Sequence, residues 1–142
     1  MIKTNARGLA LCVKHAARVM VEGRVKGSIV CTGSVAFSQG RNLFTDYSMS
    51  KHAVLGLVRA ASLQLGQHGI RVNCVSPSVV ATPMSCGAFG MDAEQVEKIS
   101  ESTSTLKGAV LKVGDVANAV LFLASDDSGF VTGLDLKLDG GT

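Results

Sequence analysis

The chain has 142 residues, the size of a single domain, and it is 46% hydrophobic and 18% charged with only 2 prolines. Its formal net charge of +3 is spread along the chain without a run of Lys or Arg, which argues against a nucleic-acid partner. No apolar run approaches the roughly 20 residues of a membrane helix, and "MIKTNARG" at residues 1–8 lacks the apolar core of a signal peptide. We therefore expect a cytoplasmic protein with no membrane partner.

The cysteines and histidines do not predict a metal site. The four cysteines are widely and unevenly spaced, and three of them lie in apolar segments: Cys12, Cys31, Cys74 and Cys86. This pattern favours small buried side chains in a reducing compartment over zinc ligands or disulfides. The three histidines fall in expected helices without the spacing of metal ligands: His15, His52 and His68. We expect no bound metal.

The first half of the chain alternates helical and extended patterns. Apolar residues recur with helical spacing over residues 8–20, and the β-branched run "SIVCT" at 28–32 predicts a buried strand. Residues 33–46 have no period and contain Gly33, Gly40 and Asn42, so they predict a loop. A long helix with a small-residue and Leu stripe is expected over 47–67.

The second half continues the alternation. "IRVNCVSP" at 70–77 predicts a second buried strand, and "DAEQVEKIS" at 92–100 a short helix within a mixed stretch. Asp115 is the expected N-cap of a helix that runs to about Ala124. The alternating "LDLKL" at 134–138 predicts a final strand.

Strands that alternate with helices predict an α/β fold with a parallel sheet. In such sheets, ligands bind at the carboxyl ends of the strands. Ser34 follows the first expected strand, and a loop after Pro77 follows the second. Because the helix that starts at Tyr47 comes directly after the first of these loops, three segments are expected to aim polar groups at one edge of the sheet.

The most informative pair of polar residues is Tyr47 and Lys51, four positions apart where the long helix begins. Positions i and i+4 share one face of a helix, so the two side chains are expected to lie together. An ammonium beside a phenol stabilises the phenolate, which favours proton exchange near neutral pH. The alternative is a solvated helix face with no chemical role.

The motifs "TGS" at 32–34, "YSMSK" at 47–51 and "IRVNCVSPSVVATPM" at 70–84 resemble those of the short-chain dehydrogenase/reductase family. The flanking "SKHAVLGL" and "LGQHGIRVNCVSP" are similar to the plant branch with secoisolariciresinol, xanthoxin and tropinone-type dehydrogenases. The resemblance covers residues 1–142. It implies the C-terminal part of a Rossmann-type doubly wound parallel sheet, strands five to seven with their flanking helices.

The resemblance implies a catalytic role for four residues. Tyr47 would be the acid/base that exchanges a proton with the substrate oxygen, and Lys51 would support it and bind the nicotinamide ribose. Ser34 would polarise the substrate carbonyl or hydroxyl, and Asn5 would hold a water that links Lys51 to solvent. Alternatively, Ser34 is a turn residue, and Asn5 or its neighbour Thr4 is a helix N-cap.

The resemblance also implies cofactor and substrate contacts. Pro77, Val80 and Thr82, together with Tyr47 and Lys51, would hold NAD or NADP, and the resembled branch favours NAD. Ser34 with Met84 and Phe89 would contact a small apolar metabolite whose hydroxyl or ketone exchanges a hydride with the cofactor. Met91 lies in the same stretch.

Four of these positions have structural alternatives. Thr82 could instead cap the segment that follows it. Met84, Phe89 and Met91 could be plain packing residues. Asn73, within an expected strand, is interpreted as a buried hydrogen-bonding residue rather than a ligand.

One family element has no counterpart in residues 1–142: the Gly-x-x-x-Gly-x-Gly turn that binds the cofactor pyrophosphate. We therefore expect a partial Rossmann domain that comprises the catalytic and substrate-facing half. Two hypotheses follow: an oxidoreductase, or a non-catalytic truncated remnant that can only pair with a full-length relative. Either would associate as a homo-oligomer, or with a relative, through helices 8–20 and 47–67, as family members commonly do.

Overall fold

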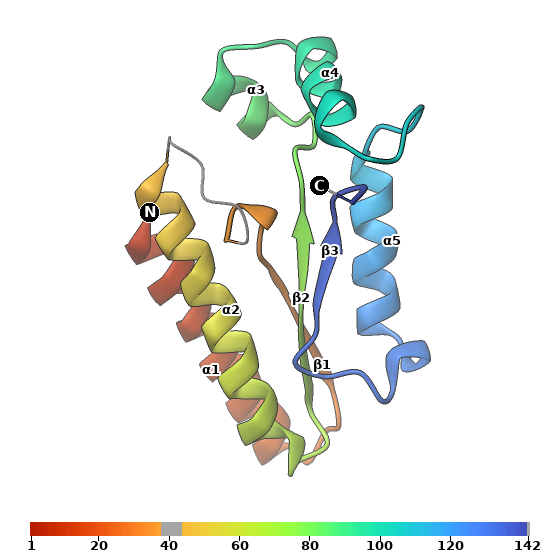
Figure 1. The fold of residues 1–142 in the computed structure, drawn as a ribbon. Coiled ribbons are helices and arrows are strands. Elements are labelled where there is room, and N and C mark those ends of the chain that lie inside the picture. The colour runs from red at the N-terminus through yellow and green to blue at the C-terminus, as the bar shows by residue number, and fades with distance from the viewer. Residues whose placement is uncertain (38–43, 142) are drawn as a thin grey trace.

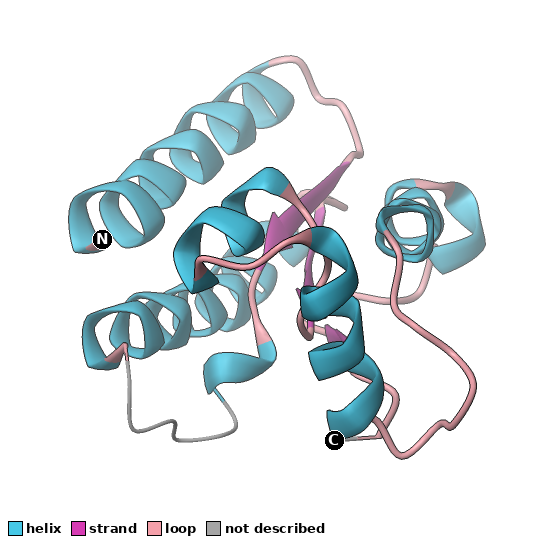
Figure 2. Ribbon diagram, turned by 90° about the horizontal axis from the view of Figure 1, so that it is seen from above, coloured by secondary structure: helices cyan, strands magenta, loops and turns pink. Residues whose placement is uncertain are grey.

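The computed structural model describes residues 1–37 and 44–141. A parallel three-stranded sheet forms the middle layer; α1 (Leu9–Glu22) and α2 (Thr45–Gly66) cover one face, and α5 (Val113–Ala124) covers the other (Figures 1 and 2). This confirms the expected α/β class. The expected loop 33–46 lies partly outside the described residues, since 38–43 are not among them.

The remaining elements follow the predicted order, with two short helices that the sequence did not indicate. The strands are β1 (Ser28–Thr32), β2 (Arg71–Pro77) and β3 (Asp135–Leu138), within one residue of their predicted bounds. α4 (Ala93–Thr103) is the predicted short helix, whereas α3 (Pro83–Phe89) and the π-helical turn η1 (Ile2–Gly8) were not expected. Two 3₁₀ turns, η2 (Val35–Phe37) and η3 (Asp126–Ser128), complete the described chain.

The strands are ordered β1-β2-β3 and run parallel. Ser28 lies opposite Arg71, and Cys74 lies opposite Asp135. The ladder extends one residue beyond β1, because the Gly33 N–H donates to the Val75 carbonyl at 2.8 Å. All three carboxyl ends therefore meet at one edge, where the expected site residues are found.

Each face of the sheet has its own apolar core. Val54 and Val58 of α2 pack with Val72 and Cys74 of β2 on one face. On the other face Val75, Ala119 and Leu123 form the second core. β2 lies between the two and is buried on both faces, as expected for the middle strand of a parallel sheet.

The prediction that Asp115 is an N-cap is wrong. α5 starts at Val113, with Lys112 as the N-cap residue, and the Asp115 carboxylate accepts from the Lys112 backbone N–H at 2.8 Å. Asp115 thus closes the first turn from its third position, where a carboxylate also interacts favourably with the positive end of the helix dipole. Either position places an acidic residue near the helix start, so composition alone could not distinguish them.

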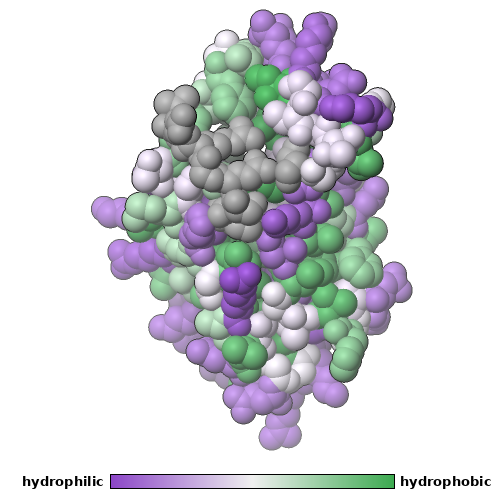
Figure 3. Space-filling model, in the orientation of Figure 1, coloured by the Kyte–Doolittle hydropathy of each residue, from purple (hydrophilic) through white to green (hydrophobic). Residues whose placement is uncertain are grey.

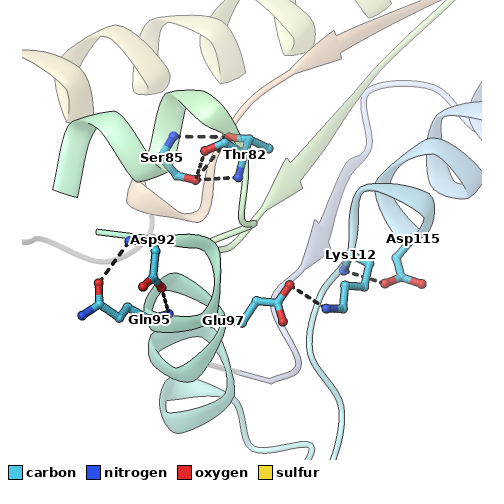
Figure 4. A network of polar contacts seen from close by, with 7 residues as sticks. All are labelled: Thr82, Ser85, Asp92, Gln95, Glu97, Lys112 and Asp115. Atoms are coloured by element: carbon cyan, nitrogen blue, oxygen red, sulfur yellow. Dashed lines mark hydrogen bonds and ion pairs between the residues drawn. The ribbon is translucent and has the colours of Figure 1, made fainter. Parts of the chain in front are cut away.

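Side-chain caps hold the three helices after β2 (Figure 4). Thr82 and Ser85 form a reciprocal capping box at α3, and Asp92 and Gln95 form another at α4. Lys112 Nζ lies 2.6 Å from Glu97 Oε1 and so joins α4 to the start of α5. The segment after β2 is therefore tied to α5 through polar contacts.

The surface in Figure 3 mixes apolar residues, in green, with hydrophilic ones, in purple. Several large apolar side chains are exposed, among them Leu63 on α2, Met84 on α3 and Phe130 after η3. No helix of the described chain is long and apolar enough to cross a membrane.

Candidate active site

Lys51 connects the first turns of α2 with the end of β1. Its Nζ donates to the Thr32 carbonyl at 3.0 Å and lies 5.6 Å from the centroid of the Tyr47 ring. That separation is within the range of a cation–π contact. The expected i, i+4 pair is therefore formed, and it is fixed to the sheet edge one residue before Gly33.

The surroundings of Lys51 are partly apolar. Burial lowers the pKa of Lys51 from its ordinary value of 10.5, while the nearby Cys74 opposes this shift. Burial also raises the pKa of the Cys74 thiol, and burial together with Cys74 raises that of Cys31 to about 11. Because Cys31 and Cys74 are protonated near neutral pH, neither is a candidate nucleophile.

Asn5 is joined to the same turn of α2 through Ser50. Asn5 Nδ2 donates to Ser50 Oγ at 3.0 Å, and Ser50 Oγ donates to the Tyr47 carbonyl at 2.7 Å. The structure thus joins Asn5 to the turn of α2 that carries Tyr47 and Lys51, and its catalytic role stays a prediction. The N-cap alternative for Thr4 or Asn5 is wrong, because both lie inside η1.

Ser34 lies directly past the end of β1, at the start of η2. Its Oγ accepts from the Ala36 N–H at 3.2 Å, so it has the role of a turn residue that the sequence left as an alternative. This bond uses one hydroxyl lone pair and leaves the hydroxyl proton available to another acceptor. η2, which follows Ser34, packs against α2, and Lys51 bonds Thr32, two residues before Ser34.

Pro77, Val80 and Thr82 lie along the path from β2 to α3. Pro77 ends β2, and Thr82 is the N-cap of α3, with its Oγ1 accepting from the Ser85 N–H at 3.3 Å. The cap alternative for Thr82 is therefore confirmed. Ser85, which the sequence did not single out, donates to the Val80 carbonyl at 2.6 Å and fixes this turn.

The apolar residues expected at the substrate lie on and after α3, at the surface. Met84 is 83% exposed, Phe89 36% and Met91 38%. Plain packing is therefore wrong for Met84, whereas Phe89 and Met91 are partly covered by the rest of the chain. Their contact with a substrate stays a prediction.

The remaining predictions concern Asn73, the cysteines and metal binding. Asn73 is fully buried, donates to the Val131 carbonyl at 2.8 Å and accepts from the Leu134 N–H at 3.0 Å, so its structural role is confirmed. Cys31 and Cys74 are buried as expected, but Cys12 is exposed, because it lies on the solvent side of α1. Within residues 1–37 and 44–141 no cluster of three His, Cys, Asp or Glu could hold a metal ion.

Comparison with known proteins agrees with this geometry. A family model described as enoyl-(acyl carrier protein) reductase matches residues 1–142. The chain is also 51% identical over 140 residues to short-chain dehydrogenase reductase 3b of Arabidopsis thaliana. This match covers 99% of this chain and 54% of that protein. The chain belongs to the short-chain dehydrogenase/reductase family.

Two other relatives are similar to this short-chain dehydrogenase/reductase chain to the same degree. It is 52% identical to (−)-isopiperitenol/(−)-carveol dehydrogenase, mitochondrial, of Mentha piperita, with 99% of this chain and 53% of that protein covered. It is also 52% identical to (+)-cis,trans-nepetalactol synthase of Nepeta racemosa, and the match covers 99% of this chain and 52% of that protein.

A solved structure shows the same architecture. Carveol dehydrogenase from Mycobacterium avium in complex with NAD superimposes with a TM-score of 0.87 at 36% identity, covering 99% of this chain and 55% of that one. The short-chain dehydrogenase/reductase chain therefore spans about half the length of the relatives it matches.

Proposed function

We propose that residues 1–142 form the catalytic half of an NAD(P)-dependent dehydrogenase that interconverts a hydroxyl and a ketone. The observation that carries this proposal is the placement of Lys51, which lies over the Tyr47 ring while bonding the Thr32 carbonyl at the sheet edge. The nicotinamide cofactor would supply the hydride acceptor or donor. The chain would supply the proton exchange and the orientation of the reacting oxygen.

In this proposal the Tyr47 hydroxyl exchanges a proton with the substrate oxygen, and the Lys51 ammonium stabilises the resulting phenolate. Ser34 donates its available hydroxyl proton to the same substrate oxygen and polarises it. Asn5 is held beside this turn, where it can bind the water that returns the proton.

The donor set fits a nicotinamide nucleotide. The Lys51 ammonium carries three protons and gives one to the Thr32 carbonyl, which leaves donors for ribose hydroxyls. The backbone from Pro77 to Thr82 leaves the carboxyl end of β2, where parallel sheets bind such ligands. We favour NAD over NADP, because the similar carveol dehydrogenase was solved with NAD.

The proposed substrate is a small, largely apolar cyclic alcohol or its ketone. Two observations support this class: the exposed Met84 and Phe89 on α3, and the names of two carveol dehydrogenases among the similar proteins. Apolar side chains of this kind favour an apolar substrate through burial of its hydrocarbon surface.

Location and assembly are proposed on separate grounds. Free thiols, including the exposed Cys12, favour a reducing compartment such as the cytoplasm. A groove of about 530 Å³ between α1 and α2 has an apolar floor, which supports homo-oligomer formation through these helices.

The test uses a fusion protein, called the joined enzyme. In it, residues 1–142 follow the part of the Mentha piperita dehydrogenase that has no counterpart in this chain. We expect it to oxidise carveol with NAD⁺ and produce NADH absorbance. Tyr47→Phe should lower kcat by about 10³-fold while changing the dissociation constant of NADH by less than about threefold, because only the hydroxyl carries the proton.

Turnover of the Tyr47→Phe enzyme within tenfold of the parent would refute the proposal. Residues 1–142 alone should show no turnover, since the phosphate-binding turn is outside them. An inactive joined enzyme that still binds NADH would favour the non-catalytic alternative.

A further inference from the structure

We propose that Phe44 is a specificity-determining residue: its ring forms part of the apolar surface against which the substrate packs, and a strained backbone holds the ring there. This deepens the proposed function and rests on it. Phe44 lies three residues before Tyr47, and neither the sequence nor the proposed reaction gave it a role. Its side chain is 46% exposed, within one helical turn of the residue proposed to exchange the proton.

The backbone of Phe44 has a conformation that residues with a side chain rarely adopt. Its φ is 82° and its ψ is 42°, in the left-handed region. There the Cβ atom of an L-residue lies too close to the following carbonyl oxygen, and for a bulky residue the conformation is an outlier. Of the residues that the structure describes, two other than Gly have a positive φ, Arg24 and Phe44. Phe44 therefore has a strained backbone.

Formation of α2 does not by itself explain this strain. Phe44 is the N-cap residue of α2, although its side chain has no polar atom with which to cap a helix. N-cap residues ordinarily have an extended backbone, as Thr82 and Asp92 do at α3 and α4. Two residues of types that cap helices well, Thr45 and Asp46, follow Phe44 directly, yet neither is the cap. Outliers that local preference does not explain cluster at active sites and ligand clamps.

Phe44 lies at the end of the molecule where the substrate is expected. Its carbonyl accepts from the Ser48 N–H at 2.9 Å, which fixes it to the first turn of α2, the turn that carries Tyr47. Figure 1 shows the start of α2 at the same end of the molecule as α3, which carries the exposed Met84. The direction of a side chain depends on the backbone conformation of its residue, so an extended N-cap would direct the ring elsewhere.

A phenyl ring at this position favours substrates with a hydrocarbon ring. An aromatic side chain contributes a large apolar area, and covering that area with an apolar ligand is favourable. A cyclic alcohol such as carveol presents such a surface around its hydroxyl. Loss of the Phe44 ring should therefore weaken binding of the alcohol and leave binding of the cofactor unchanged.

Three variants separate the effect of the ring from that of the strain. Phe44→Leu keeps an apolar side chain and Phe44→Ala removes it, but both keep a Cβ atom and therefore the strain. Phe44→Gly removes the ring and also the strain, because Gly adopts a positive φ readily.

Arg24 is the matched control for strain. Its φ is 52°, its side chain is exposed, and it lies between α1 and β1. It therefore precedes the amino end of β1, whereas the candidate site lies at the carboxyl end.

The first experiment measures kcat and KM of the joined enzyme. Phe44→Ala and Phe44→Gly should raise the KM for carveol about tenfold, the size expected for a lost apolar contact. They should change kcat and the KM for NAD⁺ by less than about twofold, because the contact is the same before and during the reaction. Phe44→Leu should keep the KM for carveol within about threefold of the parent, and Arg24→Gly within about twofold.

The second experiment measures unfolding of the same proteins in urea. The folding equilibrium constant of Phe44→Gly should be about threefold larger than that of Phe44→Ala, because relief of strain exceeds the extra chain entropy of Gly. Arg24→Gly should have the same advantage over Arg24→Ala. Relief of strain thus occurs at both positions, whereas the change in KM occurs only at Phe44.

The third experiment measures binding without turnover. Carvone, the ketone of carveol, does not react in the presence of NAD⁺, so calorimetry with both molecules gives its dissociation constant alone. This constant should rise about tenfold for Phe44→Ala and stay unchanged for Arg24→Ala.

Three results would overturn the proposal. The first is an unchanged KM for carveol and an unchanged dissociation constant of carvone in Phe44→Ala, and the second is equal stability of the Gly and Ala variants of Phe44. The third is a parent enzyme that does not bind carvone. Any of these, together with an inactive Tyr47→Phe enzyme, refutes the role of Phe44 alone. An active Tyr47→Phe enzyme refutes the proposed function, and the carvone measurement then decides the role of Phe44 independently.

Discussion

The ammonium of Lys51 is held where water is partly excluded, and this links its protonation to stability. Burial lowers the pKa of Lys51 below 10.5, the value that it regains when the chain unfolds. As pH rises through the lowered value towards 10.5, the folded chain loses this proton before the unfolded chain does. The unfolded state then binds more protons, so the contribution of Lys51 to stability must rise with pH in that window.

We predict that the wild-type chain gains stability relative to Lys51→Met as pH rises through the lowered pKa of Lys51 towards 10.5. The measurement is the free energy of unfolding in urea at several pH values for both proteins, since groups common to both cancel in the difference. Lys3→Met, at an exposed position, is the control. A difference that stays flat or falls with pH would contradict the effect of burial on Lys51.

Among the site residues, those close in sequence could be predicted and those brought together by the fold could not. The i, i+4 spacing was enough to place Lys51 over Tyr47, because a helix fixes that geometry locally. No local pattern indicates that Ser50 meets Asn5, since the contact depends on how η1 lies on α2. Asn5 was assigned only by resemblance to a family.

The end of α5 is held to the sheet by one cation. Arg71, at the start of β2, donates to the Leu123 and Ser125 carbonyls, each at 3.0 Å, and to Ser128 Oγ at 2.8 Å. The last carbonyls of a helix lack partners within the helix and carry partial negative charge. Arg71 therefore has two effects. It donates hydrogen bonds to carbonyls at the end of α5, and its positive charge interacts favourably with the negative end of the helix dipole.

We predict that Arg71→Met lowers the free energy of unfolding by about 2 kcal/mol, because charged hydrogen bonds to carbonyls are lost while the acceptors stay partly buried. Arg59→Met, on the exposed side of α2, should change it by less than about 0.5 kcal/mol. Urea unfolding monitored by circular dichroism measures both. Equal effects of the two changes would show that Arg71 contributes nothing specific.

Helices and strands with a long apolar period were predicted well, and short capped turns were not. The strand "SIVCT" matched β1 residue for residue, since a buried parallel strand is apolar throughout. α3 was missed because its seven residues are too few to show a helical period. Its signals in the sequence are Thr82 as N-cap, Pro83 at the first helical position and Gly90 directly after the end. η1 has no such signal in the sequence.

The groove between α1 and α2 is the surface expected to pair two copies of the chain. Its floor is apolar, with Val13 and Leu57 among its residues, and its rim carries Lys14, Arg18 and Glu22. A two-fold axis would bring the same groove from both copies together. Rim charges of both signs can then meet opposite charges across the axis.

We predict that the chain dimerises through this groove and that Ala10→Arg, at its edge, shifts the population to monomer. A bulky charge there removes shape complementarity and is desolvated on pairing. Ala117→Arg, on an exposed position of α5, is the matched control and should leave the mass unchanged. Sedimentation velocity at micromolar protein concentration measures the mass of each variant in solution. Identical masses for Ala10→Arg and Ala117→Arg would contradict pairing at the groove.

The parallel sheet also determines how the chain must fold in time. Ser28 pairs with Arg71, and Cys74 with Asp135, so the two ladders join positions 43 and 61 residues apart, and no hairpin can nucleate them. Loops of this length close only after the helices between them have formed, which places such folds among the slower two-state folders. Until closure, β2 exposes Val72 and Val75 on opposite faces of an unpaired strand. The delay before β2 finds both neighbours is therefore the period in which another chain can capture it.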